Sequence, residues 1–191
     1  MAKVRSWVGL DVHVRSVLAV SIDGESGELS SRRLSGITAD VVEFCSSLPG
    51  PTRVAYEAGP TVGQSDIWVL DLARGLSTRV TSSDSAWPRW SPDGKHVYYS
   101  NANGIHRKAA DGSGEEEWLL KGGVNDLVNS VSPDGNHLLY GRDDLLMLPL
   151  KGARKPQAYL QTRDLEFGGT FSPDGPSLPT SRSKFGGCAG E

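Results

Sequence analysis

The sequence predicts a mixed fold, in which a short α/β segment over residues 1–63 precedes an all-β repeat region over residues 64–175. Two observations predict it. The first segment has the element order β-β-β-α-β, and the second carries the tetrapeptide Ser-Pro-Asp-Gly three times, at spacings of 41 and 40 residues. Residues 176–191 have neither pattern and are expected to form an irregular tail. The 23 Gly and 11 Pro among 191 residues favour a turn-rich β chain over a helical bundle.

Composition and charge argue against several functional classes. The formal net charge is −3, and neither segment has the surplus of Lys and Arg that marks nucleic-acid binding. Cys45 and Cys188 form no disulfide framework and stand in no metal-ligand spacing. No apolar run approaches the roughly 20 residues of a membrane span, and the N-terminus lacks an apolar signal-peptide core. We therefore expect a cytoplasmic protein with no membrane partner.

Apolar patterning places five elements in the first segment. Strands are predicted at residues 7–12, 17–22, 28–34 and 52–56. Before the last strand, Thr38 can cap a helix whose apolar residues recur at i, i+3, i+4 and i+7. This stripe includes Cys45, which is predicted to be a small core residue. Asp11 and Glu57 stand at the ends of the first and fourth strands.

This order of elements opens an RNase H-like fold, in which the first and fourth strands lie side by side. Asp11 and Glu57 would then face one site. Two adjacent carboxylates suit a divalent cation, because hard cations prefer oxygen ligands, and paired metals stabilise the oxygens of phosphodiester chemistry. The alternative interpretation of these residue types is an Asp that forms a turn and a Glu on the solvated surface.

Two stretches carry a family resemblance. Residues 8–13 (Val-Gly-Leu-Asp-Val-His) and 53–61 (Arg-Val-Ala-Tyr-Glu-Ala-Gly-Pro-Thr) resemble the signature segments that open the DEDD-type (RuvC-like) insertion-sequence transposases. The resemblance implies a parent that recombines DNA with Mg²⁺ or Mn²⁺, with Asp11 and Glu57 as metal-binding catalytic residues. That family also needs two later aspartates and a domain with a catalytic serine, which do not follow here. We therefore expect a truncated segment without catalysis or bound metal.

The Ser-Pro-Asp-Gly copies begin at Ser91, Ser132 and Ser172. Pro presets φ, Asp bonds its own backbone and Gly relieves the last position, so each copy predicts a hairpin turn rather than a catalytic Asp. Short strands recur in phase with the copies. They are predicted at residues 67–72, 78–80, 96–100, 105–108, 117–120, 137–140, 145–148 and 158–160, and before each copy at Trp90, Val131 and Phe171. Each period thus holds four strands, as a propeller blade requires.

Period and spelling resemble the TolB-like, WD-type β-propeller repeats. The resemblance implies an incomplete propeller of about three four-stranded blades, whereas that family closes its ring with about six. An open ring exposes strand edges and apolar faces, so we expect self-association or a protein partner that completes the blades. The tryptophans at 68, 87, 90 and 118 are predicted to pack between blades, and the histidines at 96, 106 and 137 to pack rather than bind metal.

The pattern fails after Gly175, where Pro179 would remove a donor from the middle of a strand. Our hypothesis is a shift of reading frame near Leu178, which makes the last dozen residues, with Cys188, out-of-frame translation. Three functions stay open for the whole chain. The first is a non-catalytic chimeric remnant of a transposase and a propeller. The second is a protein-interaction or scaffold module that uses the repeats, and the third is a residual metal-dependent DNA-processing enzyme.

Overall fold

The structure, a computed structural model, describes residues 6–13, 16–23, 29–35, 38–47, 53–61, 64–123, 125–141, 144–161 and 169–171. Contacts divide the chain into two units. The first comprises Met1–Val54 and Leu70–Ser77, and the second comprises Ala55–Val69 and Thr78–Glu191. Within the described part of the chain, no helix has the length and apolar character needed to span a bilayer.

The first unit contains an antiparallel meander and one helix. Its strands β1 (Ser6–His13), β2 (Ser16–Asp23) and β3 (Leu29–Ser35) pair in the order β1-β2-β3. Helix α1 (Thr38–Ser46) packs against β3. Leu34, Phe44 and Cys45 are buried there, and burial raises the pKa of the Cys45 thiol. The predicted elements, the helix start at Thr38 and the core position of Cys45 are confirmed.

The fourth strand does not join the first. Strand β4 (Arg53–Thr61) lies in a separate sheet of order β4-β5-β6, with β5 at Gln64–Asp71 and β6 at Leu76–Arg79. The RNase H-like neighbourhood of the first and fourth strands is therefore a wrong prediction. The reason is local: only residues 62 and 63 separate β4 from β5, and so short a connection costs little closure entropy. Strands on both sides of the predicted boundary at residue 63 thus share one sheet.

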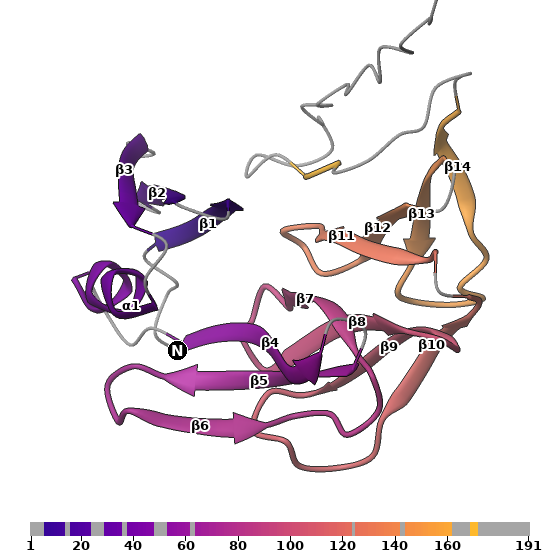
Figure 1. The fold of residues 1–191 in the computed structure, drawn as a ribbon. Coiled ribbons are helices and arrows are strands. Elements are labelled where there is room, and N and C mark those ends of the chain that lie inside the picture. The colour runs from indigo at the N-terminus through magenta and orange to yellow at the C-terminus, as the bar shows by residue number, and fades with distance from the viewer. Residues whose placement is uncertain are drawn as a thin grey trace, which may run out of the picture. The chain divides into compact units, whose positions relative to one another are not determined.

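Two sheets of four strands follow, each an antiparallel meander in sequence order (Figure 1). The first contains β7 (Ala86–Trp90), β8 (His96–Asn101), β9 (Gly104–Ala109) and β10 (Glu117–Lys121). The second contains β11 (Leu127–Val131), β12 (His137–Gly141), β13 (Leu145–Pro149) and β14 (Gln157–Leu160). Both predicted four-stranded periods are confirmed, whereas the sheet before them has three strands. The third tetrapeptide, at residues 172–175, and the tail lie outside the described residues.

The first two Ser-Pro-Asp-Gly copies form the same turn, between β7 and β8 and between β11 and β12. In the second copy the Ser132 hydroxyl donates to Asp134 Oδ1 at 2.6 Å, and Asn136 N–H donates to the same oxygen at 2.9 Å. His137 N–H then donates to the Ser132 hydroxyl at 2.9 Å. The Ser132 hydroxyl and the Asn136 N–H groups hold the pKa of Asp134 at about 2. The aspartates therefore close turns, as predicted.

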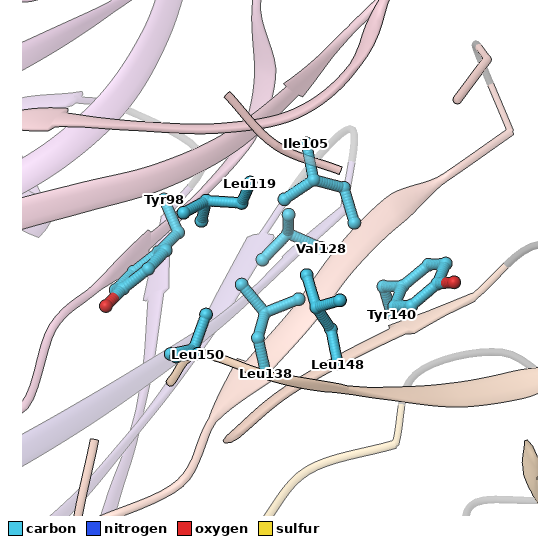
Figure 2. Packing of buried hydrophobic residues seen from close by; sticks show 8 residues of the cluster. All are labelled: Tyr98, Ile105, Leu119, Val128, Leu138, Tyr140, Leu148 and Leu150. Atoms are coloured by element: carbon cyan, nitrogen blue, oxygen red, sulfur yellow. The ribbon is translucent and has the colours of Figure 1, made fainter. Parts of the chain in front are cut away.

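Side chains on the central strands alternate between two apolar clusters. Tyr98 faces a cluster shared by the two four-stranded sheets, together with Val128 and Leu138. Its neighbour Tyr99 faces a second cluster, shared with β5. Figure 2 shows the side chains of the first cluster: Tyr98, Ile105, Leu119, Val128, Leu138, Tyr140, Leu148 and Leu150. Strand β8 is therefore buried on both faces. Such a strand needs apolar residues in succession, which explains the run Val97-Tyr98-Tyr99.

Hydrogen bonds join the same two sheets beside this cluster. The Ser100 hydroxyl donates to the Asp126 carbonyl at 2.6 Å and accepts from Val128 N–H at 3.0 Å. At the opposite edge, Arg154 Nη2 donates to Glu117 Oε1 at 2.6 Å, and Glu117 also pairs with Arg107. The buried Ser100 hydroxyl is thus satisfied by backbone groups of the neighbouring sheet, whereas the ion pairs of Glu117 are partly exposed.

Candidate ligand-binding hollow

The structure places the two predicted metal ligands on different sheets. Asp11 lies on β1 opposite Leu18, and its side chain is outside the described part of the structure. Glu57 lies on β4, where its exposed carboxylate accepts the Trp87 N–H at 2.8 Å. Among the described residues, no group of three or more His, Cys, Asp or Glu side chains is arranged to hold a metal ion. The metal role of this pair stays a prediction.

The partner of Glu57, Trp87, sits in a bulge. Ala86 pairs with Ser100, but the next pair is Arg89 with Tyr98, so β7 has one residue more than β8 between these pairs. Trp87 has φ +61°, an uncommon conformation for a bulky side chain, and the following Pro88 restricts it further. Its N–H points to Glu57 rather than into the ladder. Glu57 therefore stabilises a backbone conformation at Trp87 that the hydrogen bonds between β7 and β8 do not stabilise.

The Trp87 side chain is 45% exposed, so its predicted packing between blades is wrong. One period later β11 has an extra residue at the same place, between the pairs Val128–Tyr140 and Ser130–Leu139, yet the equivalent residue, Val128, is fully buried between the sheets. Sequence reasoning missed this difference. Both strands carry the extra residue, so the sequence signal that separates the two positions is Pro88 after Trp87 in place of Asn129 after Val128.

Trp87 lines a hollow of about 230 Å³, where β7 and β11 begin and β8 ends. The other lining residues are Asp84, Ala86, Ser100, Asn101, Ala102 and Leu127. Asn101 Oδ1 accepts the Asn103 N–H at 2.8 Å. The Ser100 hydroxyl donates to the Asp126 carbonyl and accepts from the Val128 N–H, so both polar side chains already have hydrogen-bond partners. Asp84 is exposed, and its backbone has φ +30°. Its carboxylate makes no ion pair with any residue that the structure describes.

Arg89, on the same strand β7, supports the bulge and links it to β11. Its guanidinium donates to the Asn129 carbonyl at 2.6 Å and to the Pro88 carbonyl at 2.8 Å. Burial lowers the pKa of Arg89, and the negative charge of Glu57 opposes that shift. The cation is thus engaged with backbone oxygens of β7 and β11, and part of the Glu57 charge is balanced by it.

A second polar group surrounds His106, whose ring is closed to solvent although its partner Glu116 is exposed. His106 is fully buried, stacked on Tyr99 with ring centroids 5.7 Å apart, and its Nδ1 lies 2.6 Å from Glu116 Oε1. The Tyr99 hydroxyl donates to Glu116 Oε2 at 2.7 Å. Burial lowers the pKa of His106, although Glu116 opposes the shift. His106 therefore packs between strands, as predicted, and faces no opening.

Comparison with known proteins identifies the fold. No protein-family model and no curated protein matches the sequence. Among solved structures, TolB from Acinetobacter baumannii matches with a TM-score of 0.55 and 17% identity, over 91% of this chain and 50% of that one. A putative TolB from Agrobacterium tumefaciens matches with a TM-score of 0.50 and 20% identity, over 74% and 60%. At these identities the likeness establishes the fold alone, a TolB-like β-propeller, and this chain spans half to three fifths of their length.

Proposed function

We propose that this chain is a non-catalytic protein-interaction module, a propeller segment that binds an exposed segment of a partner protein in the hollow around Trp87. The carrying observation is the half-exposed Trp87 indole, which stands on a bulge that Glu57 holds in place. Buried apolar clusters give the sheets a rigid frame beneath it. A rigid frame limits the ordering entropy that a binding residue loses on association.

Backbone strain at Trp87 supports a binding role. A non-glycine residue in the left-handed region of positive φ raises the free energy of the fold by on the order of 1–3 kcal/mol. Such a conformation persists only where its surroundings hold it, most often at ligand sites. Here Glu57 and Arg89 hold both sides of the bulge. Tryptophan is also the residue type most enriched among binding hot spots. These features favour recognition over a purely structural role for Trp87.

The environment of Glu57 favours binding over metal-dependent catalysis. Its Oε1 already accepts the Trp87 N–H, and the hollow itself is lined by one carboxylate, that of Asp84. Transposase parentage of residues 1–63, the chimeric origin and the reading-frame hypothesis stay predictions from the sequence, and the propeller matches lend the transposase parentage no support. A partner that completes the blades also stays a prediction.

An immobilised library of 15-residue peptides tests the proposal, with bound sequences resynthesised and measured by fluorescence anisotropy. Trp87→Ala should weaken binding at least about ten-fold, the level expected of a hot spot. Glu57→Gln, which keeps an acceptor oxygen, should retain binding. Tyr159→Ala is the matched control, because Tyr159 on β14 is also exposed, at 39%. Peptide binding that survives Trp87→Ala, or that Tyr159→Ala weakens equally, overturns the proposal.

A further inference from the structure

We infer that the hollow takes a cationic side chain, a lysine or arginine of the partner protein, between the Trp87 indole and the Asp84 carboxylate. The inference rests on the proposed function and names the chemistry that the hollow recognises. Both groups line the same hollow. The face of an indole attracts cations more strongly than any other aromatic side chain, and the carboxylate supplies the opposite charge.

The charge of Asp84 is available to a ligand. Two other acids of this unit already form ion pairs: Asp66 pairs with Arg79, and Glu117 pairs with Arg107 and Arg154. Asp84 has no such partner among the described residues, and the guanidinium of Arg89 on β7 is bonded to backbone carbonyls. An arriving cation therefore displaces no existing ion pair.

The walls of the hollow suit the methylene stem of such a side chain. The apolar residues Ala86, Ala102 and Leu127 also line the hollow. Lysine and arginine pack their methylene groups along apolar surface while the charged end reaches polar groups. The volume of about 230 Å³ is below the roughly 300–1,000 Å³ of pockets that enclose whole small molecules. One inserted side chain is thus the better fit.

Among the tryptophans whose side chains the structure describes, a second one is highly exposed and shows the same chemistry within the chain. Trp118 on β10 is 48% exposed, and the ammonium of Lys121 lies 4.9 Å from the centre of its ring. Lysine thus already covers one exposed indole of this chain. Trp87 has no cation over its ring among the described residues, which leaves its face free for a partner's cation.

The test uses capped single residues as probes, N-acetyl-lysine methylamide and its uncharged isostere N-acetyl-norleucine methylamide. Binding is followed by the NMR signal of the Trp87 indole N–H, assigned with Trp87→Phe. We expect lysine to bind about three-fold tighter than norleucine, the gain of one exposed cation–π contact. Asp84→Asn should reduce this preference. Glu115→Gln, which removes the same charge from an exposed site outside the hollow, should preserve it.

Equal binding of the two probes, an unmoved Trp87 signal, or an equal effect of Glu115→Gln overturns the inference. These outcomes are separable from failure of the proposed function. Library peptides that need Trp87 but bind as well with norleucine in place of each basic residue would leave a binding module of different specificity. Peptides that bind without Trp87 would end both proposals.

Discussion

Residues 87 and 128 occupy the same place in successive repeats, yet one is exposed and the other buried. Val128 continues the apolar run of β11 into the cluster between the sheets. Both backbone N–H groups donate to a side chain of another sheet, Trp87 to Glu57 and Val128 to Ser100. The two positions differ in the Trp87 φ of +61° and in Pro88, which cannot donate a hydrogen bond.

His106 makes stability depend on pH. Burial lowers its pKa in the folded chain, so the unfolded chain takes up the proton first as the pH falls through about 6.5. The stability is fully present above that pH and declines below it until folded His106 protonates. We therefore expect the urea concentration at the midpoint of unfolding to decrease when the pH is lowered from 7.5 to 5.5. His106→Phe, which keeps a ring stacked on Tyr99, should flatten this slope.

Substitution of a second histidine checks the assignment. His96→Gln changes a half-buried histidine on β8 and should leave the slope as it is. If both substitutions flatten the slope equally, the pH dependence does not originate at His106.

At the scale of elements, strand β9 starts where another backbone approaches closely. Gly104 has φ +128°, and a Cβ atom built there would lie 2.2 Å from the Leu120 carbonyl oxygen of β10. Any side chain would therefore push β10 away from β9, whereas glycine lets the two strands pair up to Lys121. Only glycine combines that φ with that contact.

Gly104→Ala and Gly114→Ala form a matched pair on the same sheet. Gly114, between β9 and β10, has φ +72° and no atom within 4 Å of a built Cβ, so alanine there costs about 1–2 kcal/mol of backbone strain. Gly104→Ala should cost more, because the β10 backbone must also shift. Urea unfolding measures both costs. Equal losses would show that the contact with Leu120 carries no energy.

At the scale of the whole molecule, the second unit is stabilised by the two apolar clusters on either side of β8, and each cluster joins neighbouring sheets. The pair Tyr98 and Tyr99 belongs to both clusters, one residue to each. Burial of each such side chain stabilises the fold by roughly 1.5–3 kcal/mol. Loss of one cluster therefore affects the sheet that bears the other, so these sheets should unfold together.

Leu138→Ala should lower the free energy of unfolding by about 2–5 kcal/mol, since Leu138 is fully buried between the two four-stranded sheets. The control is Leu76→Ala, at a position 62% exposed, which should change stability by less than about 0.5 kcal/mol. Chemical denaturation followed by tryptophan fluorescence checks both. A small loss at Leu138 would mean that the sheets do not share a packed core.

The sequence by itself determined the described strands, the first two Ser-Pro-Asp-Gly turns, the start of α1 and the burial of Cys45. Those features depend on residues within a few positions of one another: turn chemistry, capping and the periodicity of apolar residues. Only the tertiary structure decided that β4 pairs with β5 rather than β1, and that Trp87 faces a hollow. The first outcome follows from the short connection between β4 and β5, which strand patterns alone do not weigh against a pairing with β1. The second depends on groups distant in the sequence, such as the Glu57 carboxylate and the Trp87 N–H, and no local pattern encodes their contact.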